Sequence, residues 1–151
     1  MIFAKGLIAN VKDTDDDILA VYVGTKSNIY YNYPQDSADN NFKSRDWYVQ
    51  AMANPGQIII TNPYISKVLG KNVVSIARTI ENNTSVIGVV SVEIDLAMFS
   101  NSLSEVKVGN NGYIFVADNE GNIISHPQQT LIAINAAKDL SFWAEATSNH
   151  E

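Results

Sequence analysis

Three short segments of the sequence carry side chains that suit the binding of a small zwitterion. The residues concerned are Arg45, Trp47, Tyr48, Tyr64 and Asp95. An arginine guanidinium can hold a carboxylate through two parallel hydrogen bonds. An aspartate at the other end can accept hydrogen bonds from an ammonium group, and aromatic rings between the two attract a cation through their faces. The pattern indicates a pocket for a molecule such as an amino acid.

Each of these residues also has a purely structural interpretation. The aromatic side chains can belong to the hydrophobic core. Arg45 falls in the first turn of an expected helix, where its charge would be exposed to solvent. Asp95 comes directly before another expected helix, in the position of an N-cap. The sequence alone leaves both interpretations open.

Signatures of catalysis and of metal binding are weak. The chain has no cysteine, and neither His126 nor His150 has a second histidine at the spacing of metal ligands. The acidic run 13–17 lacks the glycine and the distal glutamate of an EF-hand loop. No Gly-x-Ser-x-Gly, Gly-x-Gly-x-x-Gly or P-loop pattern is present. The sequence therefore predicts no enzyme, no metal and no cofactor, and a small hydrolase is the weakest alternative.

The order of expected elements predicts an α+β fold. Strands are expected at 18–24, 28–33, 57–61, 72–80, 86–95, 112–117 and 122–126, and helices at 44–54 and 96–106. The first dozen residues have helical spacing, 35–41 is a polar loop, and 131–137 and 140–146 are possible helical pieces. This order differs from the strand–helix alternation of a parallel sheet. A PAS-like antiparallel sheet flanked by helices is the expected architecture.

The expected strand 86–95 alternates between two kinds of side chain. Val90, Val92 and Ile94 share one face. Ser91, Glu93 and Asp95 share the other face, because successive side chains of a strand point to opposite sides.

Composition narrows the class of partner. The 151 residues are 46% hydrophobic, which is enough to form a core, and the net charge of −6 makes nucleic acid a poor partner. The longest apolar stretches have the length of strands, not the ~20 residues of a membrane-spanning helix. The start of the chain lacks the features of a signal peptide. We expect a soluble piece that binds a small molecule.

Five segments, taken in order, resemble the double Cache sensor family. They are RDWY at 45–48, ITNPYI at 60–65, VVSIAR at 73–78, IGVVSVEIDL at 87–96 and GYIFVADNEGNIISHP at 112–127. The resemblance implies the extracytoplasmic sensor of a bacterial methyl-accepting chemotaxis receptor. It further implies a membrane-anchored, homodimeric parent protein, with residues 1–97 as the membrane-distal module. Residues 98–151 would then hold a linker helix and the start of a membrane-proximal module. Other hosts of the family include sensor kinases.

The resemblance also implies a set of ligand-binding residues. Members that bind amino acids carry an Arg-x-Trp-Tyr segment, a Tyr-x-Asp segment and a later Asp. Here the matching residues are Arg45, Trp47, Tyr48, Tyr64, Ser66 and Asp95, with Ser66 in place of the first Asp. Because a hydroxyl is a weaker acceptor than a carboxylate, a plain carboxylate ligand is an alternative to an amino acid. Signalling through a partner protein, without a directly bound ligand, is a second alternative.

Overall fold

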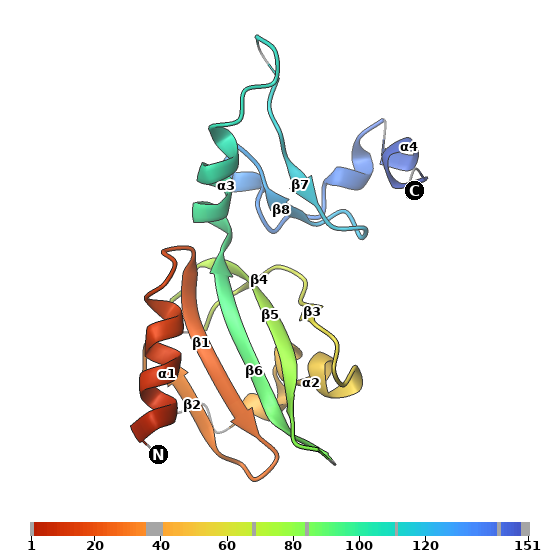
Figure 1. Ribbon diagram of the computed structural model, residues 1–151. Coiled ribbons are helices and arrows are strands. Elements are labelled where there is room, and N and C mark those ends of the chain that lie inside the picture. Colours follow the sequence, from red (N-terminus) through yellow and green to blue (C-terminus); the bar gives the residue numbers. More distant parts are fainter. Residues whose placement is uncertain are drawn as a thin grey trace.

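The computed structural model describes residues 2–35, 41–67, 69–83, 85–110, 112–141 and 143–148 (Figure 1). The α-helices are α1 (Ile2–Lys12), α2 (Asp46–Ala53), α3 (Leu96–Ser104) and α4 (Trp143–Ser148). The strands are β1 (Ile18–Thr25), β2 (Tyr30–Tyr33), β3 (Ile59–Ile60), β4 (Tyr64–Ile65), β5 (Asn72–Glu81), β6 (Val86–Asp95), β7 (Val116–Ala117) and β8 (Ile123–Ser125). Three short 3₁₀ helices lie at Phe42–Ser44, Gln129–Leu131 and Ala137–Asp139.

A six-stranded antiparallel sheet forms the larger part of the molecule. Its order is β2-β1-β6-β5-β3, and β4 also pairs with β5. In Figure 1, α1 lies along β1 and β2, whereas α2 lies behind β5 and β6. The arrangement confirms the α+β, PAS-like fold expected from the sequence.

The two long central strands bury the more polar of their faces. In β6, Val89, Ser91, Glu93 and Asp95 are buried, while the residues between them are partly exposed. The expected alternation is thus confirmed, and the face that carries the carboxylates is the one that α2 covers. Polar side chains on this face must find hydrogen-bond partners there, because burying them without partners costs free energy.

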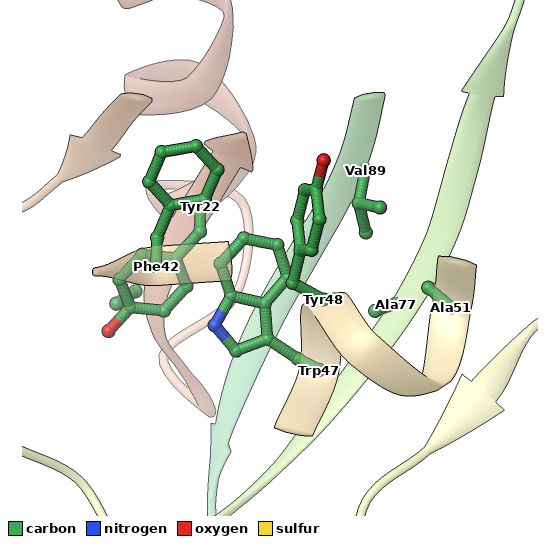
Figure 2. Packing of buried hydrophobic residues seen from close by; sticks show 8 residues of the cluster. Tyr22, Phe42, Trp47, Tyr48, Ala51, Ala77 and Val89 are labelled. Atoms are coloured by element: carbon green, nitrogen blue, oxygen red, sulfur yellow. The ribbon is translucent and has the colours of Figure 1, made fainter. Parts of the chain in front are cut away.

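Aromatic rings fill the space between the sheet and α2 (Figure 2). The buried cluster consists of Ala20, Tyr22, Phe42, Trp47, Tyr48, Ala51, Ala77 and Val89. The indole of Trp47 lies between the edge-on ring of Tyr48, 5.6 Å away, and the stacked ring of Tyr22, 5.9 Å away. Aromatic pairs in these arrangements contribute about 0.5–1.5 kcal/mol each beyond their buried area. The cluster therefore fixes the start of α2 against the sheet.

Most differences from the sequence-based expectations concern the ends of elements. The helix expected at 44–54 begins at Asp46, and the helix expected at 96–106 ends at Ser104. The strand expected at 57–61 shrinks to Ile59–Ile60, and the two expected at 112–117 and 122–126 shrink to β7 and β8. Near the C-terminus, 3₁₀ turns and α4 replace the two expected helical pieces. Most of the polar loop 35–41 and His150 lie outside the described residues.

A smaller unit follows the sheet. α3 continues directly from the end of β6 and contacts β8, which pairs with β7 (Figure 1). A second buried cluster joins the two parts, with Val74 from the sheet, Leu96 from α3 and Ile132 from the C-terminal unit. Among the described helices, none combines the length and apolar composition that crossing a bilayer requires.

Candidate ligand-binding site

A cavity of about 300 Å³ lies between the start of α2 and the segment around β4. Its lining residues are Ser44, Arg45, Asp46, Trp47, Tyr64, Ile65 and Lys67. Small-molecule sites in proteins measure about 300–1,000 Å³. The cavity thus has room for a ligand at the small end of that range, such as a single amino acid.

A buried carboxylate lies beside two of the lining residues. Glu93 is 0% exposed. Its Oε1 atom accepts hydrogen bonds from Arg45 Nη2 at 3.2 Å and from the Tyr64 hydroxyl at 2.7 Å, and its Oε2 atom accepts one from Ser66 Oγ at 2.9 Å. Three donors, one of them cationic, compensate the cost of burying this group.

The hydroxyl of Tyr64 connects Glu93 to a second strand. Ser75 Oγ lies 2.7 Å from that hydroxyl. A phenol has one proton, so when Tyr64 donates to Glu93 it must accept from Ser75. The resulting chain runs from Ser75 on β5 through Tyr64 on β4 to Glu93 on β6, and it fixes the orientation of the carboxylate.

The arginine at the cavity wall is held from two sides. Arg45 is 8% exposed, forms an ion pair with Glu93, and places its guanidinium 4.8 Å from the ring centre of Tyr22. Burial, followed by the charge of Glu93, raises the pKa of the Tyr22 hydroxyl well above its usual range. Burial and Glu93 raise the pKa of Tyr64 in the same way. Both phenols are therefore neutral at physiological pH, and that of Tyr64 donates to Glu93.

One buried donor at the cavity has no acceptor. Within the described residues, the indole Nε1 of Trp47 has no hydrogen-bond partner, although the residue is 1% exposed and lines the cavity. Arg45 uses one of its five N–H groups on Glu93. A buried donor without an acceptor costs about 1–3 kcal/mol, so a ligand oxygen that accepted from Trp47 would relieve that cost.

The structure brings together four of the six residues expected from the sequence. Arg45, Trp47 and Tyr64 line the cavity, and Ser66 lies buried against Glu93. Tyr48 lies behind Trp47 as part of the aromatic core cluster.

Asp95 lies outside the group around Arg45. Its Oδ1 atom accepts hydrogen bonds from the backbone N–H groups of Ala97 and Met98, at 2.9 and 3.4 Å, which makes it the N-cap of α3. Its Oδ2 atom accepts from Lys71 Nζ at 2.7 Å. These contacts agree with the structural interpretation of Asp95 as an N-cap. A ligand-binding role for Asp95 stays a prediction.

Glu93 is the residue at this site that the sequence analysis missed. The alternation of β6 places it on the same face as Asp95, so the pattern does contain a signal. Its position between two β-branched neighbours gives no hint of which carboxylate bonds to the residues of the cavity wall. Among the described residues there is no group of histidine and acidic side chains that could hold a metal ion.

Comparison with known proteins assigns the chain to a family. The Cache domain family matches residues 6–148, which is almost the whole sequence. The chain belongs to the Cache domain family. The resemblance noted from the sequence segments is thus confirmed.

Relatives of this Cache domain include several methyl-accepting chemotaxis proteins. McpC of Bacillus subtilis is 34% identical over 122 residues, which cover 80% of this chain and 19% of McpC. PscA of Pseudomonas syringae is 30% identical over 122 residues, which cover 80% of this chain and 19% of PscA. The sequence thus spans about a fifth of the length of each relative.

Solved structures of chemoreceptor ligand-binding domains have the same fold. The domain of CtaA from Pseudomonas fluorescens in complex with L-valine is 26% identical with a TM-score of 0.71, over 85% of this chain and 58% of that one. The domain of PctB from Pseudomonas aeruginosa in complex with L-Gln has a TM-score of 0.76 at 23% identity, over 91% of this chain and 57% of that one. The second likeness shows the fold alone.

Proposed function

We propose that this Cache domain is an extracytoplasmic sensor of a chemoreceptor, with no catalytic role, and that its cavity binds a small amino acid. The observation that carries the proposal is the pairing of Arg45, in the cavity wall, with the buried Glu93 beside it. The chemotaxis relatives and the L-valine bound by the CtaA domain support the same function.

The charges at the site favour a zwitterion over a plain carboxylate. Arg45 and Glu93 form one internal ion pair. An amino acid between them would bring its carboxylate to Arg45 and its ammonium to Glu93, so that every buried charge keeps an opposite partner. A carboxylate without an amine would add a negative charge close to Glu93 and no positive one. A zwitterion therefore fits the site better.

Each residue of the site has a proposed role. Arg45 and the indole N–H of Trp47 would donate to the ligand carboxylate, and Tyr64 and Tyr48 would form or support the walls. Of the two carboxylates near the end of β6, Glu93 is better placed than Asp95 to receive the ammonium, because Glu93 is bonded to the cavity-lining residues Arg45 and Tyr64, whereas Asp95 caps α3. Ser66 would position Glu93.

The wider setting is part of the same proposal. The parent protein would be a homodimer anchored in a membrane, with residues 1–97 as the distal sensing module and residues 98–151 as the linker helix and the start of a proximal module. The alignment of this chain with about a fifth of McpC supports a longer parent.

Thermal unfolding in the presence of each common amino acid tests the function. At least one amino acid should raise the midpoint, since a ligand at 100 times its Kd stabilises the folded state by about 2.7 kcal/mol. Arg45→Ala should abolish the shift. Lys43→Ala is the matched control, because Lys43 donates to the Lys26 carbonyl and does not line the cavity.

A second variant tests the role of Glu93. Glu93→Gln keeps the shape of the side chain and removes its charge. It should weaken binding of the amino acid about tenfold or more, whereas the same acid without its amine should bind no worse than to the wild type. If no amino acid stabilises the folded wild-type protein at millimolar concentration, the proposed function is wrong.

A further inference from the structure

The hairpin formed by β4 and β5 touches two carboxylates on the neighbouring strand. Tyr64, which lines the cavity, and Ser66, buried beside it, donate hydrogen bonds to Glu93. Five residues after Ser66, at the other end of the same short loop, Lys71 donates to Asp95 at 2.7 Å. Glu93 and Asp95 are two residues apart on β6 and face the same side. The hairpin therefore connects the cavity with the end of β6 independently of the β6 backbone.

The loop of this hairpin is closed by its own backbone. The N–H of Ser66 donates to the Lys71 carbonyl at 2.8 Å, and the N–H of Gly70 donates to the Ser66 carbonyl at 2.8 Å. Ile65 pairs with Asn72 in the register of the two strands. Because the two ends of the loop are joined in this way, a displacement of Ser66 at the cavity moves Lys71 with it.

Asp95 links Lys71 to the start of α3. Its side chain is 2% exposed, and it caps the N–H groups of Ala97 and Met98. The next residue, Leu96, is buried between Val74 of the sheet and Ile132 of the C-terminal unit. A capping side chain contributes about 0.5–2 kcal/mol to its helix. The position of Asp95 thus affects the first turn of α3 and the junction of the two units.

We propose that the β4–β5 hairpin is a latch, in which the Lys71–Asp95 ion pair couples the cavity to the N-terminal end of α3. The latch goes beyond the proposed function, because it states by which contacts a change at the cavity reaches the C-terminal unit. Lys71 is suited to this role: its side chain is 52% exposed and lies at the surface, while its partner is buried. When the pair breaks, Lys71 is left in solvent, and the buried Asp95 keeps its hydrogen bonds from the Ala97 and Met98 amides.

Amide hydrogen exchange in the complete protein, without any ligand, tests the latch. Ser66→Ala perturbs the cavity end, and Lys71→Met removes the ion pair while keeping an apolar stem of similar length. The readout is the exchange rate of the Ala97 and Met98 amides, which Asp95 caps. Ser66→Ala should speed their exchange about threefold or more, and in the Lys71→Met background the same change should have almost no further effect.

Two controls isolate the Lys71 contact. Lys107→Met removes an exposed positive charge elsewhere, so it should leave the effect of Ser66→Ala on Ala97 unchanged. Asn62→Ala removes the hydrogen bond from Asn62 to Glu120, which is a second contact between the cavity segment and the C-terminal unit. This change should also leave the effect of Ser66→Ala on Ala97 exchange unchanged. The Val89 amide in the middle of the sheet reports global opening and should not change.

A parallel cycle with Tyr64→Phe removes the other hydrogen bond from the hairpin to Glu93, so the test does not depend on one variant. The latch is wrong if either cavity variant affects Ala97 equally with and without Lys71, because the coupling would then run along β6 itself. It is also wrong if neither folded variant alters Ala97 exchange. Since no ligand is used, these outcomes are independent of whether the cavity binds an amino acid.

Discussion

Two tyrosine hydroxyls next to a buried glutamate make the site sensitive to alkaline conditions. Tyr22 and Tyr64 are surrounded by the sheet and α2, and burial together with the charge of Glu93 raises the pKa of both. In the unfolded chain the same groups titrate near pH 10. Folding therefore favours the protonated, neutral form of both hydroxyls.

This difference predicts a loss of stability at high pH. Below about pH 10 both states keep the tyrosine protons, so these groups cause no pH dependence. Above it the unfolded chain loses its protons first, and the free energy of unfolding falls as pH rises towards the folded-state pKa. We expect the thermal midpoint to drop as the pH rises above about pH 10.

Tyr64→Phe should make that drop smaller, although it lowers the midpoint at neutral pH by removing a hydrogen bond to Glu93. Tyr113→Phe, at a 58% exposed position, is the control and should leave the curve unchanged. If the thermal midpoints of the wild type and both variants fall equally with pH, the loss of stability does not come from Tyr64.

At this scale the sequence identified three of the seven residues that line the cavity, Arg45, Trp47 and Tyr64, but not their partner Glu93. Arg45 and Trp47 could be predicted from the sequence, because their side-chain chemistry and their short spacing suffice to suggest a pocket. Which of Glu93 and Asp95 bonds to Arg45 could not be predicted from the sequence, because both lie on one face of the same strand. It depends on where the β4–β5 hairpin lies, and that position is a matter of tertiary packing.

Among the elements, β1 and the 3₁₀ helix Phe42–Ser44 approach each other closely at a glycine. A Cβ atom added at Gly24 would lie 2.5 Å from Cε2 of Phe42, a ring that is itself 2% exposed and stacked against Tyr30. Real Cβ atoms do not approach that closely, so the ring would have to shift. The absence of a side chain at Gly24 lets the aromatic core cluster lie flat on the sheet.

Gly24→Ala should therefore destabilise the protein by about 1–3 kcal/mol through overpacking. Gly6→Ala is the matched control: Gly6 lies in α1 with nothing within 4 Å of an added Cβ atom. In a helix that change should stabilise by about 0.5–1 kcal/mol. Chemical denaturation measures both, and a neutral Gly24→Ala would show that the ring moves without cost.

The elements that the sequence predicted best are the long alternating strands. The strand at 86–95 was predicted with its observed bounds, and that at 72–80 is one residue longer in the structure. β3 and β4 are two residues each and have no periodicity of their own, since their pairing with β5 defines them. Loop and tail segments near the C-terminus likewise lack a repeating pattern, so their 3₁₀ turns could not be predicted.

At the scale of the molecule, two structural units of unequal size meet at a small buried cluster. The larger contains the six-stranded sheet, and the smaller has the two short strands β7 and β8. Leu96 and Ile132 lie in the buried cluster between them, together with Val74. A unit with so few paired strands should open locally before the sheet does.

Ile132→Ala tests the junction. Removing this buried side chain should cost the C-terminal unit about 2–5 kcal/mol of local stability. Hydrogen exchange should then become faster at Ile123 and Ser125 in β8, while the amides of Val89 and Val90 in the sheet stay protected. Equal acceleration in both regions would mean that the two units unfold as one.

The position of Trp47 has an optical consequence. The chain contains two tryptophans, one in the wall of the cavity and the other, Trp143, in α4 of the smaller unit. The fluorescence of an indole depends on the polarity around it and on quenching groups nearby. A protein with Trp143→Phe would emit from the cavity wall alone. The domain thus carries its own fluorescent reporter, which makes occupancy of the cavity measurable without an added label.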